Sequence, residues 1–169
     1  MIVMPESFLK VSVASQTLAL IDNGRIVKTY LVSTAKNGPG EQKGSGCTPR
    51  GWHRIRAKIG DGQPPNAVFV GRRPTGEIYG DDLAARYPDR DWILTRILWL
   101  DGLEPGFNRY GDVDTGQRYI YIHGSPDCGV TGQPLSHGCI RMNSDDVLEL
   151  YGRVGEGCRV PIKGIKKGR

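Results

Sequence analysis

The sequence predicts a mainly β fold with one or two short helices. The chain has 169 residues, with 24 glycines and 11 prolines, a composition that implies many turns and few long helices. Apolar and polar residues alternate over several short segments, as they do along half-buried strands. The length suits a single domain, and we expect a core at residues 7–162 followed by a basic tail at 163–169, with no internal repeat and no linker.

The first strands are expected near the N-terminus. Residues 9–14 alternate between apolar and polar or small side chains, which predicts a strand. Residues 18–21 are followed by Asn23-Gly24, a strong two-residue hairpin signal, and then by an extended segment at 25–32. Together these segments predict a meander of strands.

A loop and a further strand follow. Residues 33–46 are rich in Gly, Lys, Asn, Pro and Ser, which predicts a flexible loop that ends at 47–51. Residues 53–59 alternate again, with His53, Ile55 and other apolar residues on one face. The opposite face is basic, and we expect it to be solvated.

The segment at residues 60–116 is harder to assign. It contains a short apolar run at 67–70, a possible helical turn at 81–87 and an apolar run at 92–100. A stretch rich in Gly, Asn and Asp ends it. Composition alone does not distinguish a lid over a functional site from an extended surface connection, so both alternatives stay open.

The next segment carries the candidate chemistry. Residues 117–123 alternate as a strand does, with Tyr119, Tyr121 and His123 on one face and His123 at the strand end. A loop rich in Gly, Pro, Ser and Asp then returns to Ser136-His137-Gly138-Cys139. An imidazole can take the proton of a thiol and leave the more reactive thiolate. The pair predicts a cysteine acyl-transfer enzyme with Cys139 as nucleophile and His123 as base.

A short helix should follow this loop. Asn143 or Ser144 can cap it, two aspartates suit its positive N-terminal end, and an apolar stripe lies at residues 147–151. Residues 158–162 predict a last strand. The tail at 163–169 is basic and is expected to be solvated.

Charge and hydropathy argue against nucleic acid and membrane as binding partners. The 23 basic and 18 acidic residues give a net charge of +5, which suits an anionic substrate but falls short of a nucleic-acid-binding surface. No apolar stretch is long enough to span a membrane, so no membrane partner is expected. Residues 1–6 lack the basic and apolar regions of a secretory signal, which predicts a cytoplasmic protein with reduced cysteines. A periplasmic location is the alternative if a native leader is missing.

The cysteines have alternative candidate roles besides catalysis. A zinc site at His123, Cys128, His137 and Cys139 does not match the usual spacing of paired ligands, so neither a metal nor another cofactor is expected. Cys139 could also be an inert buried thiol, but its glycine and polar neighbours argue against this. For Cys128, simple packing is favoured over a regulatory disulfide.

Several motifs resemble one known family. These are His123-Gly124, the run from Ser136 through Met142 (SHGCIRM), the segment 157–162, and Thr48-Pro-Arg-Gly51 upstream. Over nearly the whole chain they resemble the L,D-transpeptidase catalytic domain of the YkuD type. The resemblance implies a β-sandwich of mixed sheets with little helix.

The same resemblance implies the substrate. It points to peptidoglycan stem tetrapeptides or muropeptides, cut between the third residue, usually a diamino acid, and the terminal D-alanine. It also implies covalent inhibition by carbapenem-type β-lactams.

The resemblance further implies individual roles. Cys139 forms a thioester, His123 moves the proton, and the Gly124 carbonyl orients the imidazole ring. The backbone N–H groups of Gly138 and Cys139, with that of His137, are expected to hold the oxyanion.

Four side chains are expected to shape or bind the substrate site. Ser136 and His137 should shape the pocket by hydrogen bonds, and Tyr121 should form a wall of the cleft. Arg141 either binds a substrate carboxylate or braces the loop, and bracing is favoured because a residue two positions past the nucleophile often points away.

The acceptor of the acyl group decides the biological function. Because a cytoplasmic enzyme would meet soluble muropeptides, we expect an L,D-carboxypeptidase that releases D-alanine in peptidoglycan recycling. One alternative is an exported L,D-transpeptidase that forms 3→3 cross-links. Another is a catalytically inactive wall-binding module.

Overall fold

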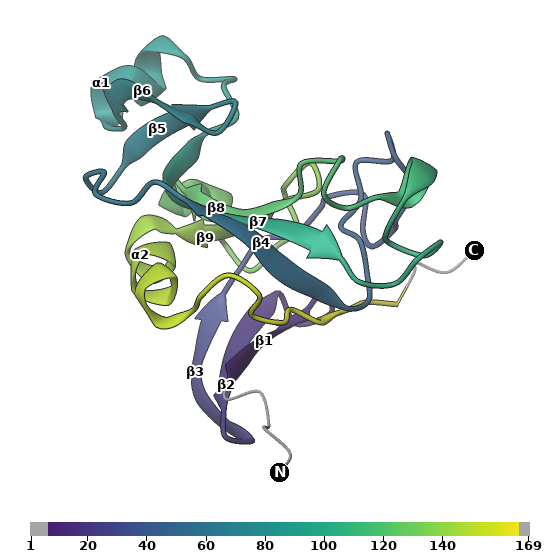
Figure 1. Cartoon of the computed structure of the whole chain (residues 1–169). Coiled ribbons are helices and arrows are strands. Elements are labelled where there is room, and N and C mark those ends of the chain that lie inside the picture. Colours follow the sequence, from purple (N-terminus) through teal and green to yellow (C-terminus); the bar gives the residue numbers. More distant parts are fainter. Residues whose placement is uncertain (1–6, 166–169) are drawn as a thin grey trace.

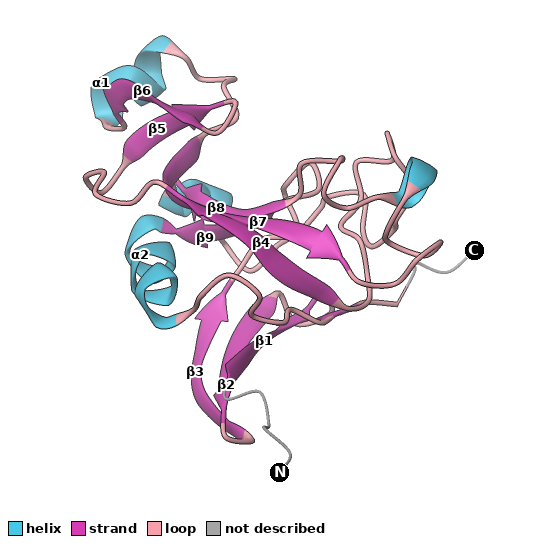
Figure 2. Ribbon diagram, viewed as in Figure 1, coloured by secondary structure: helices cyan, strands magenta, loops and turns pink. Residues whose placement is uncertain are grey.

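Two mixed β-sheets dominate the structure, a computed structural model that describes residues 7–165 (Figures 1 and 2). The predicted mainly β fold with few helices is confirmed. In chain order the elements are β1 (Ser7–Ser12), β2 (Thr17–Asp22), β3 (Arg25–Leu31), β4 (His53–Ile59), β5 (Ala67–Val70), β6 (Arg73–Ile78), α1 (Asp81–Arg86), β7 (Ile93–Gly102), the 3-10 turn η1 (Gly111–Val113), β8 (Tyr121–Ser125), the 3-10 turn η2 (Asp127–Gly129), β9 (Ile140–Asn143), α2 (Ser144–Arg153) and β10 (Ile162–Lys163).

The first sheet has the strand order β10-β1-β2-β3. β1, β2 and β3 form the predicted antiparallel meander, and β10 adds to β1 in parallel. Asn23 and Gly24 both have positive φ, at 49° and 78°, as a tight two-residue hairpin requires. The hairpin prediction is therefore confirmed.

The second sheet is built around β7. Its order is β6-β5-β7-β8-β9, and β4 also pairs with β7. The early residues of β7 pair with β5 and the later ones with β4, while β8 runs along the other edge. β8 and β9 are parallel, so this sheet is mixed as well.

The main core lies between the two sheets and α2. In Figure 1 the β1–β2–β3 meander lies below β4 and β7, and α2 lies at the left of the body; α2 contacts β7, β8 and β9. The core side chains are apolar and almost fully buried, which provides the main driving force for folding. They include Leu9, Val11, Leu18, Leu20, Tyr30, Val32, Ile55, Leu98, Leu100, Ile120, Ile122, Ile140, Met142, Val147 and Leu150.

The helix after the nucleophile loop is present as predicted. The Asn143 side chain accepts a hydrogen bond of 2.9 Å from the backbone N–H of Asp146, which satisfies one of the free donors at the start of α2. Val147, Leu150 and Tyr151 supply its buried stripe.

The strand prediction at residues 117–123 was wrong in its boundaries: β8 covers Tyr121–Ser125, so His123 lies in the middle of the strand and not at its end. β8 begins only at Tyr121, because the Asp114 carboxylate accepts a hydrogen bond from the N–H of Gln117 and draws the preceding residues into turns. Tyr119 has a left-handed backbone with φ of 57° and therefore does not continue the face of Tyr121.

The last predicted strand is also corrected. Residues 158–161 run between β1 and β4 with isolated bridges at Arg159, and the regular strand β10 covers only Ile162–Lys163. Pro161 has no N–H and cannot continue a ladder. Lys163, expected in the basic tail, belongs to this strand, and residues 166–169 of the tail lie outside the described part of the chain.

The segment 60–116 is neither a simple lid nor a surface connection. The predicted run at 67–70 is β5, the helical turn is α1, and the apolar run is β7, which lies inside the second sheet. The β5–β6 hairpin and α1 stand out from the body at the top of Figure 1.

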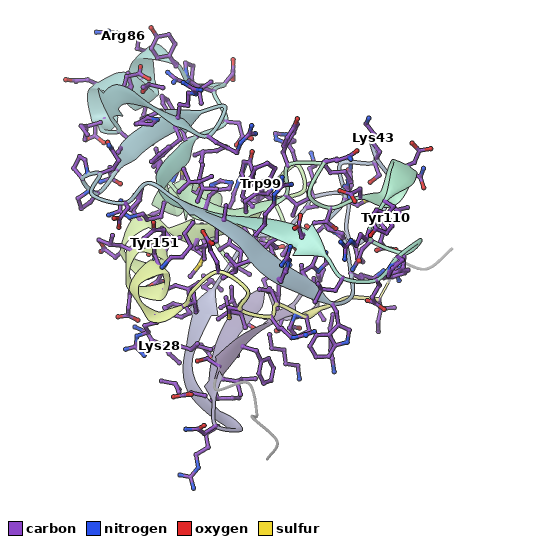
Figure 3. The ribbon with its side chains drawn as sticks, viewed as in Figure 1. Lys28, Lys43, Arg86, Trp99, Tyr110 and Tyr151 are labelled. Carbon is purple, nitrogen blue, oxygen red and sulfur yellow. The ribbon has the colours of Figure 1, made fainter. Side chains whose placement is uncertain are left out.

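The basic face of β4 is more than a solvated surface. Lys58 donates to the carbonyl oxygens of Tyr151 and Val154 at the end of α2, at 2.7 and 2.8 Å. Arg56 lies over the ring of Trp99, with 4.0 Å from Cζ to the ring centroid. Figure 3 labels both Trp99 and Tyr151.

Candidate active site

The parallel pairing of β8 and β9 brings the predicted pair together. In this register His123 lies opposite Arg141 and Ile122 lies opposite Ile140. Cys139 immediately precedes Ile140 and therefore lies next to Tyr121. Because alternate residues of a strand share one face, the side chains of Cys139 and His123 lie on the same face as diagonal neighbours.

His123 is held as a neutral base. Its ring is buried, with 2% of the residue exposed, and its Nδ1 lies 2.7 Å from the Gly124 carbonyl oxygen. A carbonyl only accepts hydrogen bonds, so Nδ1 carries the proton and Nε2 keeps a free lone pair. Burial lowers the pKa of His123, partly offset by this hydrogen bond. The expected backbone partner of the imidazole is therefore in place.

The Cys139 thiol is protonated at rest. Burial raises its pKa to about 11, although a hydrogen bond of 3.3 Å from the Tyr121 N–H to Sγ acts in the opposite direction. Sγ also lies 3.5 Å from the carbonyl oxygen of Tyr119. Within residues 7–165 no hydrogen bond joins the thiol to the His123 ring. The site thus holds a thiol and a neutral imidazole on the same face of the sheet.

Gly124 is required by its surroundings. A Cβ at this position would collide with the carbonyl oxygen of Leu94 on β7 and would lie 3.1 Å from Cγ1 of Val147 on α2. The absence of a side chain lets β8 approach both elements closely.

Hydrogen bonds from behind hold the nucleophile loop. Ser136 is buried, and its hydroxyl donates to the Cys139 carbonyl at 2.6 Å and accepts from the Gly138 N–H at 3.2 Å. Thr48 donates to the Gly138 carbonyl at 2.9 Å. Gly138 has φ of 134°, a conformation that L side chains rarely adopt. Ser136 therefore shapes the loop from the inside and does not face a ligand.

The three expected oxyanion donors differ in whether they are already hydrogen-bonded. The Gly138 N–H already binds Ser136. The N–H groups of His137 and Cys139 have no hydrogen-bond partner among the described residues. These two donors are the ones available to an incoming oxygen.

Asp91 is a member of the site that sequence reasoning missed. Its Oδ1 lies 3.0 Å from Nη2 of Arg141, and its Oδ2 lies 3.4 Å from Nδ1 of His137. The Arg141 side chain is only 13% exposed, which matches bracing better than capture of a free carboxylate. No local motif marks Asp91, because it comes from the turn before β7 and meets Arg141 only in the folded chain.

A hollow of about 440 Å³ adjoins this group. His137, Arg141 and Asp91 form one side, and Trp92, Leu135 and the exposed Cys128 also line it. The opposite side of the thiol is formed by Tyr121, Tyr119 and Trp99, with Arg72 from the tip of the β5–β6 hairpin. Sequence reasoning gave no role to Arg72 or Trp99.

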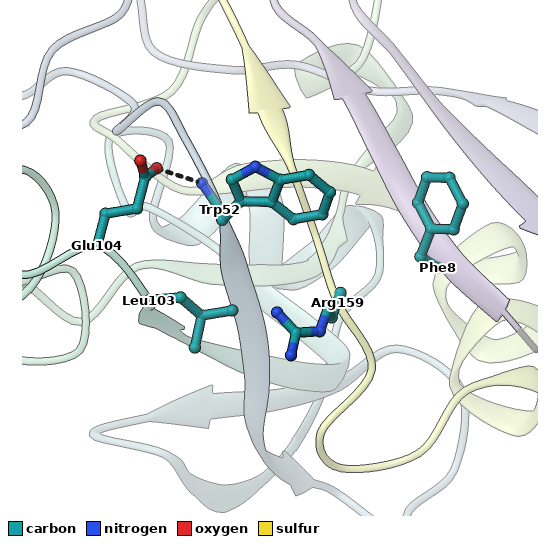
Figure 4. A pocket seen from close by; sticks show the side chains of 5 residues that line it. All are labelled: Phe8, Trp52, Leu103, Glu104 and Arg159. Carbon is teal, nitrogen blue, oxygen red and sulfur yellow. Dashed lines mark hydrogen bonds between the residues drawn. The ribbon is translucent and has the colours of Figure 1, made fainter. Parts of the chain in front are cut away.

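A second hollow of about 420 Å³ lies elsewhere (Figure 4). It is lined by Phe8, Trp52, Leu103, Glu104 and Arg159, and the Glu104 carboxylate accepts a hydrogen bond of 2.8 Å from the Trp52 N–H. None of these residues contacts the thiol or the imidazole, so this hollow is not part of the candidate site.

Neither a metal-binding cluster nor a membrane-spanning helix occurs within residues 7–165. No three His, Cys, Asp or Glu side chains in that range are grouped so as to hold a metal ion. No helix there has the length and apolar character needed to cross a membrane. All four cysteines are free thiols, and the role of Cys128 stays a prediction.

A family model supports the motif-based resemblance. The model described as YkuD, L,D-transpeptidase catalytic domain, matches residues 6–162. The YkuD protein of Bacillus subtilis strain 168 is 26% identical over 156 residues, which are 91% of this chain and 64% of that protein. The chain therefore spans somewhat less than two thirds of the length of this curated relative.

Solved structures share the fold. An L,D-transpeptidase from Xylanimonas cellulosilytica superposes with a TM-score of 0.56 at 17% identity, covering 95% of this chain and 62% of that one. L,D-transpeptidase 3 from Mycobacterium tuberculosis, in complex with a faropenem-derived adduct, gives a TM-score of 0.55 at 16% identity, with 94% and 60% covered. At these identities the likeness shows the fold.

Proposed function

The chain belongs to the L,D-transpeptidase catalytic domain family, and we propose that residues 7–162 form a cysteine acyl-transfer domain acting on peptidoglycan stem tetrapeptides. The bond cut is the one between the third residue and the terminal D-alanine. One observation carries this proposal: the Cys139 thiol and the His123 imidazole share a face, and the Gly124 carbonyl leaves Nε2 of the ring free.

The first half of the reaction forms a thioester. Nε2 of His123 takes the thiol proton as Sγ of Cys139 bonds to the carbonyl carbon of the third residue. The negative charge moves to the carbonyl oxygen, where the N–H groups of His137 and Cys139 can donate to it. When the carbon–nitrogen bond breaks, His123 returns the proton to the D-alanine amine, and the thioester remains.

The second half of the reaction releases the acyl group. Water or an amine attacks the thioester carbonyl, and His123 takes the proton of this nucleophile. The carbon–sulfur bond then breaks, and the Cys139 thiol regains its proton. Water yields a tripeptide, whereas an amine yields a cross-link.

For the acceptor, we propose water first, which makes the protein an L,D-carboxypeptidase of peptidoglycan recycling. Its support is that Cys139 is partly exposed, so that water can reach the thioester without a dedicated acceptor site. The second candidate is a transpeptidase that forms 3→3 cross-links. It is favoured by the hollow beside His137, where the half-exposed carboxylate of Asp91 could attract the ammonium group of an acceptor.

A product assay tests both candidates. Disaccharide-tetrapeptide is incubated with the wild-type protein and with Cys139→Ala, with and without EDTA, and at low and high substrate concentration. We expect D-alanine and tripeptide from the wild type only, unaffected by EDTA. If cross-linked dimer forms faster than tripeptide, the protein is a transpeptidase and not a hydrolase. Binding without turnover, equal in both proteins, would favour the inactive wall-binding module.

A further inference from the structure

Arg72 differs from Arg141 and Arg56, two other arginines near the site, because it has no carboxylate partner. It lies at the tip of the β5–β6 hairpin, with φ of 66°. Arg141 pairs with Asp91 and Arg56 pairs with Asp101, at 3.0 and 3.6 Å. Within residues 7–165 no Asp or Glu oxygen lies within 4.0 Å of the Arg72 guanidinium.

Aromatic side chains hold the Arg72 guanidinium in place. Its Cζ lies 4.6 Å from the ring centroid of Trp99 and 4.9 Å from that of Tyr119. Its Nη1 donates to the Tyr121 hydroxyl at 3.0 Å. Stacking on aromatic faces orients a guanidinium without using its N–H groups. Most of the five donors therefore remain available to a ligand.

The same aromatic residues surround the nucleophile. The Tyr121 N–H donates to Sγ of Cys139 at 3.3 Å, and the Tyr119 carbonyl oxygen lies 3.5 Å from Sγ. Trp99 and Cys139 pack against one small apolar cluster that includes Tyr121. Arg72 is thus separated from the reacting sulfur by single side chains.

We propose that Arg72 binds a carboxylate of the stem peptide and makes the enzyme selective for substrates in which that carboxylate is free. The inference rests on the proposed function. A guanidinium fork matches a carboxylate in shape and charge, and the two can form parallel N–H···O bonds.

Two carboxylates of the substrate belong to the residues on either side of the scissile bond and are the candidates for this ligand. One is the terminal carboxylate of D-alanine. The other is the side-chain carboxylate of a diaminopimelate third residue. Both have the same chemistry, so the experiment must vary them separately.

The chain offers a matched control. Arg56 stacks on the same Trp99 ring, at 4.0 Å, but its charge is already paired with Asp101. Replacing Arg56 therefore removes a guanidinium that stacks on Trp99 but leaves the unpaired guanidinium of Arg72 in place.

The test combines variants with substrate analogues. We would measure kcat/KM for the wild type, Arg72→Gln and Arg56→Gln. The substrates are the diaminopimelate tetrapeptide, its C-terminal carboxamide, and the tetrapeptide with lysine in third position. Arg72→Gln should lower kcat/KM for the first substrate by about 10- to 100-fold, the range for a hydrogen bond to a charged group. Arg72→Gln should have little effect on the one analogue that lacks the carboxylate bound by Arg72. The identity of that analogue shows which of the two carboxylates Arg72 binds. Arg56→Gln should leave the ratios between substrates unchanged.

An equal loss on all three substrates in Arg72→Gln would overturn the inference and make Arg72 a structural clamp. Binding measured by calorimetry in the Cys139→Ala background keeps the test independent of turnover. If the wild type turns over no substrate, the proposed function fails. The inference about Arg72 still stands in that case if Cys139→Ala binds the peptides with the free carboxylate more tightly and the added Arg72→Gln substitution abolishes this preference. Binding with no such preference, or no binding of any of the three peptides, overturns it.

Discussion

At the residue scale, Cys139 and His123 form a neutral pair and not a preformed thiolate–imidazolium pair. Burial raises the pKa of the thiol to about 11 and lowers the pKa of the imidazole, so neither group is charged at neutral pH. Reactivity then depends on a substrate that fits the site and accepts the developing charge.

Alkylation of Cys139 should therefore depend steeply on pH. With iodoacetamide, the rate at Cys139 should keep rising from pH 7 to pH 10, since the thiolate fraction is still small there. Peptide mass spectrometry separates this cysteine from the other three. The urea-unfolded protein is the control, because its cysteines titrate near the ordinary value of about 8.5. A rate for the folded protein that levels off below pH 8 would contradict the neutral pair.

The residues that sequence could identify are those inside contiguous motifs. Cys139, His123 and Gly124 belong to such motifs, and the structure brings them together as expected. Asp91 and Arg72 were missed, because their contacts join segments that no spacing rule connects.

At the element scale, the close approach of β8 to β7 and α2 positions the base. β7 carries an irregularity between Leu94 and Ile97, where Thr95 has φ of 74°. The Leu94 carbonyl beside this bulge faces Gly124, so the backbone that orients His123 tolerates no side chain there.

Gly124→Ala should lower both stability and activity. The added methyl group must displace Leu94 or Val147, which should cost about 1–3 kcal/mol in the free energy of unfolding. It should also lower kcat, because the carbonyl that orients the imidazole moves. Urea unfolding and the D-alanine assay measure the two effects.

Gly152→Ala is the matched control for this substitution. Gly152 lies in α2 with no atom within 4 Å of an added Cβ, so the change should be neutral or stabilise by up to about 1 kcal/mol. Equal stability of the two variants would contradict the argument from close packing.

The strands that were misplaced show what periodicity cannot detect. Residues 117–123 alternate in sequence, but the Asp114 carboxylate accepts hydrogen bonds from the backbone N–H groups of Tyr110 and Gln117, which turns the chain before Tyr121. Residues 158–162 were predicted as one strand, but Pro161 interrupts the ladder and only Ile162 belongs to the regular strand β10. By contrast, the hairpin at Asn23-Gly24 and the cap at Asn143 depend on local chemistry and were predictable.

At the scale of the whole molecule, His53 links β4 to the long loop after β7. Its Nδ1 lies 3.0 Å from the Gly51 carbonyl oxygen and its Nε2 lies 2.9 Å from the Thr115 hydroxyl. The ring is fully buried, and burial lowers its pKa to about 4. His53 must therefore be neutral in the folded protein.

Stability should fall between pH 6.5 and pH 4. A histidine whose pKa is lowered by folding stabilises the protein above its unfolded pKa of about 6.5, and this contribution is lost as the pH falls toward the folded pKa. For His53 the loss is about 3 kcal/mol. Urea unfolding at pH 7, 6, 5 and 4 should show it.

His53→Asn is the comparison for this pH dependence. An amide can donate to the Gly51 carbonyl but does not titrate, so the variant should be less stable at pH 7 and less sensitive to acid. The same slope in both proteins would mean that His53 does not control acid stability.

The covalent intermediate provides the most direct test of the proposed chemistry. Acid-quenched mixtures of the protein with stem tetrapeptide, sampled within the first turnovers, would be measured by intact-protein mass and peptide mapping. We predict an adduct with the mass of the tripeptide acyl group on Cys139, accompanied by one D-alanine for each adduct, and none on Cys139→Ala. D-alanine release by Cys139→Ala at the wild-type rate, or an adduct on another residue, would contradict the assignment of Cys139 as the nucleophile.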